Sequence, residues 1–193
     1  FLSQGVHKHK PMPILGTSKI IDGDTLYHTI ADFSFTNQYG ETVTNNTFSD
    51  DIVVVDYIFT TCGGICPKMS DQMMVVQERF RDADDVKILS HTVNPENDNV
   101  SVLKEYAEQY GAIKDKWHFV TGSKNDLYTM GVNSYLIPTQ EDPLAPGGFL
   151  HSEMFVLIDK NQHIRGFFDG TNSNEVNDLI NAIKFLKLYK KDD

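Results

Sequence analysis

The only two cysteines of this 193-residue chain, Cys62 and Cys66, lie close together with three residues between them. A structural disulfide explains the pair weakly, since a chain of this length buries enough core to fold without one. A redox pair is a second explanation, because a thiolate beside another thiol can attack a disulfide and then be resolved, although two intervening residues would suit that chemistry better. A metal site is the third, because the flexible Gly63-Gly64 lets both sulfurs point at one ion.

Among seven histidines, His151 is the leading candidate for a further metal ligand. The sequence predicts that it begins the penultimate strand, directly after Gly147-Gly148-Phe149-Leu150. In thioredoxin-like proteins that position normally holds a cis-proline facing the two sulfurs, so an imidazole there would point at the same spot. The other histidines lie in the tail, before the first hairpin or in ordinary strands: His7, His9, His28, His91, His118 and His163.

Two thiolates and one imidazole form a soft set of three ligands. Such a set suits copper, which can be Cu(I) or Cu(II), and it suits Cu(I) best. It has one ligand fewer than the four ligands of structural zinc. An incomplete ligand shell also leaves room for a ligand from a partner, which the transfer of a metal between proteins requires. The soft donors that remain have helix and strand spacings, which favour core positions over ligation: Met69, Met73, Met74 and Met154.

The cysteines follow a run typical of a buried central strand. Residues Ile52 to Phe59 are mostly β-branched and aromatic. After the cysteines, apolar residues recur at helical spacing from Met69 to Phe80, and Pro67 is tolerated only in the first turn of a helix. We therefore expect Cys66 beside the helix N-terminus and Cys62 in the loop above it. The helix dipole there favours a thiolate, and this edge of an α/β sheet is where ligands bind.

The remaining pattern alternates between strand and helix periods. It predicts an N-terminal hairpin, a mixed central sheet flanked by helices, a long loop from Pro138 to Gly148, and a closing hairpin followed by a last helix. The order ββαβαβαββα, with paired cysteines after an early central strand, describes an α/β domain of thioredoxin-like fold. The expected segments are Phe33–Thr36, Thr42–Thr44, Val86–Val93, Ser101–Tyr110, Trp117–Thr121, Lys124–Met130, His151–Asp159, His163–Asp169 and a helix carrying Val176 to Leu186.

The composition of the chain excludes some classes of function. The net charge of −10 disfavours nucleic acid, whose phosphates require clustered cations. No apolar run approaches the roughly 20 residues of a membrane helix. The chain starts at Phe1, which suggests a longer precursor. We expect residues 1–24 to be a tether or disordered segment, residues 25–193 to form a single domain, and the protein to be a monomer.

The sequence resembles the Sco/SenC family in three elements that occur in order and cover roughly residues 30–190. Tyr57-Ile-Phe-Thr-Thr-Cys62-Gly-Gly-Ile-Cys66-Pro67 is similar to the family signature, a Cys-x-x-x-Cys-Pro after an aromatic-rich strand. Asn94-Pro95-Glu96-Asn97-Asp98 resembles the family's Asp-Pro-Glu-Arg-Asp segment, and Phe119-Val-Thr-Gly122 another element. His151 follows Cys66 by 85 positions (151 − 66), near the family's usual separation. The chain departs from the family at Gly63-Gly64 and at Asn97, which replaces the usual arginine.

The resemblance implies a copper metallochaperone with Cys62, Cys66 and His151 as ligands. Its expected client is the CuA centre of cytochrome c oxidase, in subunit II, or another copper protein. The family also implies a thiol-disulfide activity alongside, with a thioredoxin-like reductant as a further partner, and a membrane-anchored domain facing the periplasm or the outside. The alternative function is a thiol-disulfide oxidoreductase of the cell envelope, in which Cys62 and Cys66 are the catalytic redox pair.

Overall fold

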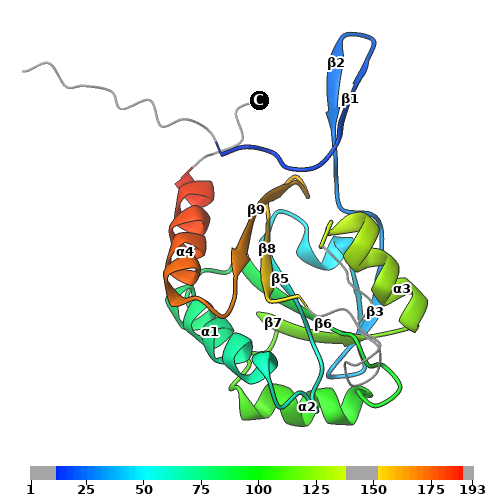
Figure 1. Ribbon diagram of the computed structural model, residues 1–193, viewed down its shortest axis with the longest axis vertical. Coiled ribbons are helices and arrows are strands. Elements are labelled where there is room, and N and C mark those ends of the chain that lie inside the picture. Colours follow the sequence, from blue (N-terminus) through cyan, green and yellow to red (C-terminus); the bar gives the residue numbers. More distant parts are fainter. Residues whose placement is uncertain (1–11, 138–151, 189–193) are drawn as a thin grey trace, which may run out of the picture.

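A computed structural model describes residues 12–137 and 152–188 of the chain (Figure 1). Its strands form two sheets. A small one pairs β1 (Ser18–Ile21) with β2 (Asp24–Tyr27). The large one has seven strands in the order β4-β3-β7-β6-β5-β8-β9, with these bounds: β3 (Ser34–Asn37), β4 (Thr42–Thr44), β5 (Ile52–Ile58), β6 (Val86–Thr92), β7 (Trp117–Thr121), β8 (Met154–Ile158) and β9 (Ile164–Asp169).

The large sheet is mixed, as expected of a thioredoxin-like domain. Strands β5, β6 and β7 are parallel neighbours, whereas β3, β8 and β9 join the sheet through antiparallel pairs. All seven residues of β5 are buried, which confirms the predicted central strand. This burial follows from its β-branched composition, because such residues pack well on both faces of a sheet.

In the described part of the chain, four α-helices surround the large sheet: α1 (Ile65–Arg79), α2 (Val100–Gln109), α3 (Lys124–Thr129) and α4 (Ser173–Leu188). Figure 1 shows α1 beside α4, with α2 near them and α3 on the other side of the sheet. The crossovers β5-α1-β6 and β6-α2-β7 connect parallel neighbours in sequence, so their usual right-handedness puts α1 and α2 on one face. No described helix is both long and apolar enough to cross a membrane.

Most expected elements appear with shifts of one to three residues at their ends. Helix α1 begins at Ile65, so Pro67 is its third residue and lies in the first turn, where a missing N–H costs little. Helix α3 continues into a π-helical turn at Met130–Ser134, and a 3-10 turn at Asn45–Phe48 links β4 to β5. The loop expected at Pro138–Gly148 lies outside the described residues.

Strand β1 lies within residues 1–24, which the sequence predicts to be a tether or disordered segment. Chain from residue 12 onward is also attached to β9, because Arg165 donates to the carbonyls of Met12 and Pro13 and Leu15 forms a β-bridge with Ile164. The division into one tether and one domain otherwise stays a prediction.

Candidate thiol and metal site

The two cysteines lie at the connection between β5 and α1. Cys66 is the second residue of α1 and only 3% exposed, whereas Cys62 lies in the preceding loop and is partly exposed. The backbone N–H of Cys62 donates to the carbonyl oxygen of Phe59 (3.1 Å), which turns the chain directly after the strand. Both positions agree with the sequence prediction, at the carboxyl edge of the parallel strands.

The sulfurs contact each other as free thiols. Their side chains are joined by a hydrogen bond, and the backbone N–H groups of Gly64, Ile65 and Cys66 also point at the Cys62 sulfur. The Cys62 sulfur lies 3.8 Å from the position that a Cβ on Gly64 would occupy. The loop thus wraps its backbone donors around one sulfur of the pair.

The two thiols differ in acidity. Burial acts to raise the pKa of Cys62, but the hydrogen bond from Cys66 and the three backbone N–H groups outweigh it, so this pKa lies below the ordinary value of a thiol. Burial, the hydrogen bond to Cys62 and the charges of Cys62 and Asp56 raise the pKa of Cys66 well above the ordinary value. Cys62 is therefore the thiol that loses its proton first as the pH rises.

Asp56 is a buried carboxyl group beneath this site. Its Oδ1 accepts a hydrogen bond from Ser90 Oγ (2.5 Å), which in turn accepts one from Trp117 Nε1 (2.9 Å). Its Oδ2 has no hydrogen-bond partner among the described residues. Burial raises the pKa of Asp56 to about 7. The sequence shows this residue only as an interruption in an apolar strand and did not single it out for the site.

His151 lies outside the described residues, so its side chain is not placed. Within the described chain, no group of three or more His, Cys, Asp or Glu side chains could hold a metal ion. Four described histidines bond or stack elsewhere. His28 bonds Ser134, His91 bonds Tyr135, His118 bonds Asn37, and His163 lies beside Asp159 and Tyr27.

The methionines on α1 have the core role that their spacing predicts. Met69 and Met73 are fully buried, and Met74 is partly buried against the same core. Met69 and Met73 are therefore not available to a partner at the surface, and the soft donors of the thiol loop itself are the two cysteine sulfurs.

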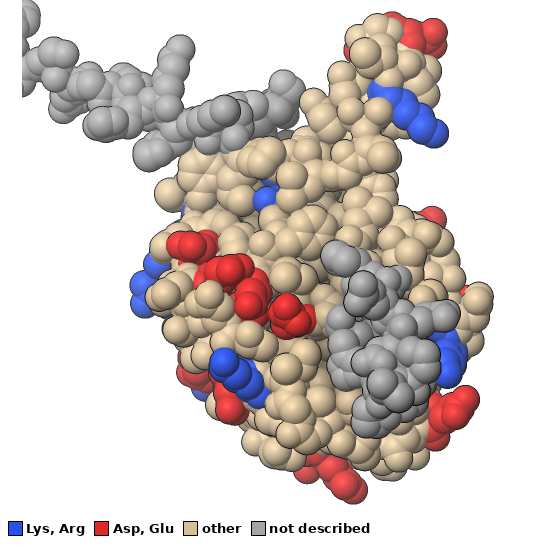
Figure 2. All heavy atoms as spheres, in the orientation of Figure 1, with Lys and Arg blue, Asp and Glu red and all other residues tan. Residues whose placement is uncertain are grey.

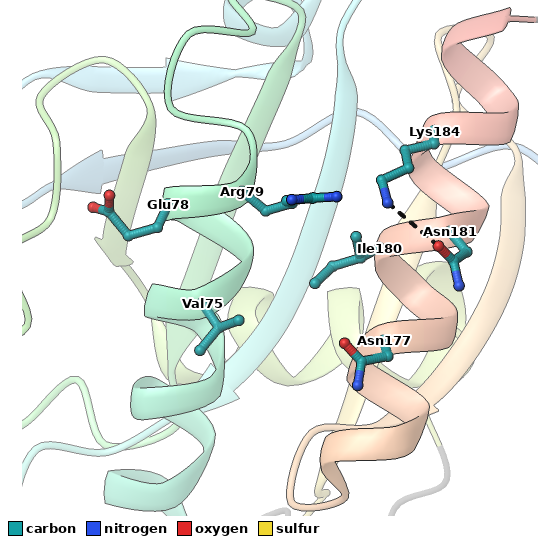
Figure 3. Close-up of a pocket in the computed structure, with 7 residues that line it drawn as sticks. All are labelled: Val75, Glu78, Arg79, Asn177, Ile180, Asn181 and Lys184. Atoms are coloured by element: carbon teal, nitrogen blue, oxygen red, sulfur yellow. Dashed lines mark hydrogen bonds between the residues drawn. The ribbon is translucent and has the colours of Figure 1, made fainter.

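A groove of about 680 Å³ lies between α1 and α4, and neither cysteine lines it (Figure 3). Val75 and Ile180 form its apolar part, and Arg79 and Lys184 border it. The thiol loop is therefore not part of this groove. On the face in Figure 2, acidic side chains gather over β9 and the start of α4, in line with the net charge of −10.

A mixed sheet with two cysteines between its central strand and the following helix defines the class of thioredoxin-like domains. Within that class, the chain belongs to the SCO1/SenC family, whose sequence pattern matches residues 22–186. The match covers the thiol loop and the Asn94–Asp98 segment. It confirms the family and the fold that the sequence predicts.

The solved structures that are similar to this chain include the following three. A SCO1/SenC family lipoprotein from Bacillus anthracis is 25% identical, with a TM-score of 0.75 over 83% of this chain and 95% of that one. BsSco, a member of the Sco family of cytochrome c oxidase assembly proteins in which a disulfide switch was identified, is 27% identical, with a TM-score of 0.73 over 84% and 95%. Copper-bound ScoI from Bradyrhizobium japonicum is 21% identical, with a TM-score of 0.66 over 84% and 99%, and supports the fold alone.

Proposed function

We propose that this protein carries copper and delivers it for the assembly of cytochrome c oxidase, with Cys62, Cys66 and His151 as the ligands. The observation that carries the proposal is the pair of free, hydrogen-bonded sulfurs on a partly exposed loop, one of which has a lowered pKa. A thiolate is the form that binds a metal, and two thiolates favour a soft ion such as Cu(I). Copper is here the cargo of the protein.

The register of the sheet supports His151 as the third ligand. Val55 of β5 lies opposite Val156 of β8, and continuing this antiparallel register by three residues brings the end of β5 opposite Glu153. Cys62 follows the end of β5 by four residues, and His151 precedes Glu153 by two. We therefore propose that His151 reaches the same edge of the sheet as the sulfurs.

Copper delivery by partner contact also fits the surroundings of the loop. Cys62 is partly exposed, and three ligands leave one position for a ligand of the receiving protein. The relatives described above include an oxidase assembly protein and a lipoprotein. We accordingly propose subunit II of the oxidase, with its CuA centre, as the client, and an anchored location on the outer side of the membrane.

The test is a titration of the fully reduced protein with Cu(I) under anaerobic conditions, in competition with a chromogenic chelator. We expect one tightly bound ion per chain, loss of tight binding in Cys62→Ser and Cys66→Ser, and binding weakened at least about tenfold in His151→Ala. His163→Ala is the matched control, because His163 directly precedes β9 and lies beside Asp159, so the variant should bind Cu(I) as tightly as the wild type. Unchanged affinity in His151→Ala would remove this residue from the site.

The asymmetry of the two thiols favours a second candidate, a thiol-disulfide oxidoreductase. In that reaction the Cys62 thiolate attacks a client disulfide and releases one client thiolate, which leaves a mixed disulfide. Cys66 then loses its proton and attacks the Cys62 sulfur, so that the client dithiol leaves and the Cys62–Cys66 disulfide forms. Cys62 has the low pKa and the exposure of the attacking group, and Cys66 has the burial of the resolving group.

Reaction with an aromatic disulfide that releases a coloured thiolate tests this candidate. The wild type should release two coloured thiolates per chain, whereas Cys66→Ser should release one and retain the other as a mixed disulfide. Cys62→Ser should react much more slowly, because the remaining Cys66 is buried with a raised pKa. Equal reaction rates of Cys62→Ser and Cys66→Ser would contradict the assignment. His151→Ala, if it exchanges disulfides normally but binds copper weakly, separates the two functions.

A further inference from the structure

Asp98 is a fully buried carboxylate at the end of the segment between β6 and α2. Its oxygens accept hydrogen bonds from three side chains and one backbone group. Thr60 supplies two of these bonds, from Oγ1 (2.6 Å) and from its backbone N–H (3.2 Å). Thr92 Oγ1 at the end of β6 (2.5 Å) and Asn97 Nδ2 (2.8 Å) supply the others.

These hydrogen bonds contribute strongly to stability because Asp98 is buried. A carboxylate away from water is unfavourable unless donors satisfy its oxygens, and hydrogen bonds to a charged acceptor are about twice as strong as neutral ones. Four donors meet that need here. Any movement of Thr60 away from Asp98 would leave part of a buried charge unsatisfied, so the two residues are held together.

Thr60 lies two residues before Cys62, at the start of the thiol loop. The far end of this loop is fixed by α1, in which Cys66 and Met69 are buried. Between these ends lie Gly63 and Gly64, and a Cβ on Gly63 would meet no atom within 4 Å. A Cβ on Gly64 would meet only the Cys62 sulfur, at 3.8 Å, so the two consecutive glycines provide little restraint of their own. The bonds that hold Thr60 therefore add a restraint on Cys62 from outside the loop, beside the bond that its own N–H makes to Phe59.

We propose that Asp98 is a positioning residue, which holds the thiol loop through Thr60 so that the Cys62 sulfur stays in contact with the Cys66 sulfur. The role in copper binding rests on the function proposed above, because the same positioning lets both sulfurs reach one Cu(I) ion. Asp98 itself does not touch the metal. It also connects the loop to the end of β6 through Thr92, so that two neighbouring strands of the sheet hold the loop together.

Thr60→Val and Asp98→Asn test the proposal, with Thr60→Ser as the matched control. Valine keeps the shape of threonine but removes the hydroxyl donor, whereas serine keeps the donor. The first readout is the Cu(I) affinity, measured by competition as above. The second needs no metal: the equilibrium between the Cys62–Cys66 disulfide and glutathione reports how often the two sulfurs meet.

We expect Thr60→Val and Asp98→Asn to bind Cu(I) about tenfold more weakly than the wild type, and their disulfide equilibrium constant to fall several-fold. Thr60→Ser should match the wild type in both measurements. A second control is Gln77→Ala, which removes a different buried link, between α1 and the chain at Gly111 and Ile113, and lowers stability away from the loop. It should leave both readouts unchanged.

Two negative outcomes are distinct. If Thr60→Val and Asp98→Asn match Thr60→Ser in both readouts, Asp98 has no positioning role. If the wild type itself fails to bind one Cu(I), the copper function is lost, and the glutathione equilibrium alone then decides whether Asp98 holds the loop. A loss of affinity in Gln77→Ala as large as in Thr60→Val would mean that general stability, and not the loop, sets the binding.

Discussion

At the scale of single residues, Asp56 and His91 are titratable side chains that the sheet buries on its opposite faces. Asp56 and His91 lie on neighbouring strands, where Asp56 pairs with Ser90 and His91 with Tyr57. The His91 ring stacks on Tyr57 at 4.9 Å between centroids, and Phe35 and Tyr135 also contact it. Burial lowers the pKa of His91 to about 3, so the ring is neutral in the folded protein.

We predict that His91→Phe makes the protein less sensitive to acid. Above pH 6.5 the histidine is neutral in both states and contributes no pH dependence. As the pH falls from 6.5 towards 3, the unfolded chain takes up a proton on His91 that the folded protein does not, so the contribution of His91 to the free energy of unfolding falls by about 1.4 kcal/mol per pH unit. Urea unfolding at pH 7.5 and pH 5 should show a drop about 2 kcal/mol smaller in the variant. Equal drops would show that His91 is not buried as described.

At the scale of elements, the β1–β2 hairpin stands apart from the rest of the fold. All eight residues of its strands are exposed, with Ile20 at 79%, and Figure 1 shows the hairpin projecting from the body. The contact of Tyr27 with the ring of His163 links it to β9. A two-stranded ribbon without a packed face is marginally stable on its own.

We predict that replacing residues 18–27 by a short Gly/Ser linker changes the free energy of unfolding by less than about 1 kcal/mol, because the hairpin buries little apolar surface. The replacement is geometrically simple, since Ser18 lies opposite Tyr27. Thermal and urea unfolding, together with the copper titration, should match those of the wild type. Loss of cooperative unfolding would show that the hairpin stabilises the main sheet.

Whether an element could be predicted depended on its burial. Strand β5 and helix α2 have strong apolar periods because one or both of their faces are buried, and the sequence predicts both within one or two residues. The β1–β2 hairpin buries neither face, so its strands have no such period. Its turn did offer a signal, since Asp22-Gly23, both with positive φ, is a dipeptide typical of two-residue hairpins.

The candidate site was predictable only in part. Cys62 and Cys66 were recognisable by their type and spacing, and Pro67 located the start of α1. The link between Asp98 and Thr60 was not, because it joins residues 38 positions apart (98 − 60) and depends on how two loops meet in space. Asp98 appeared in the sequence only as part of a segment similar to the family's.

At the scale of the whole molecule, the site belongs to the sheet edge where three separate stretches of chain meet. These are the loop after β5, the segment after β6 that ends at Asp98, and the start of β8. The first two are joined by hydrogen bonds, and the third is aligned with them by its pairing to β5. No single stretch forms this edge alone.

The pairing of β5 with β8 also matters while the chain is being synthesised. Synthesis runs from the N-terminus, so Cys66 is made 88 residues before Met154, the first residue of β8 (154 − 66). Until β8 emerges, one edge of β5 has no neighbour, and the thiol pair lies beside an unfinished sheet. The thiol pair therefore reaches its final surroundings only after β8 has been made and has paired with β5.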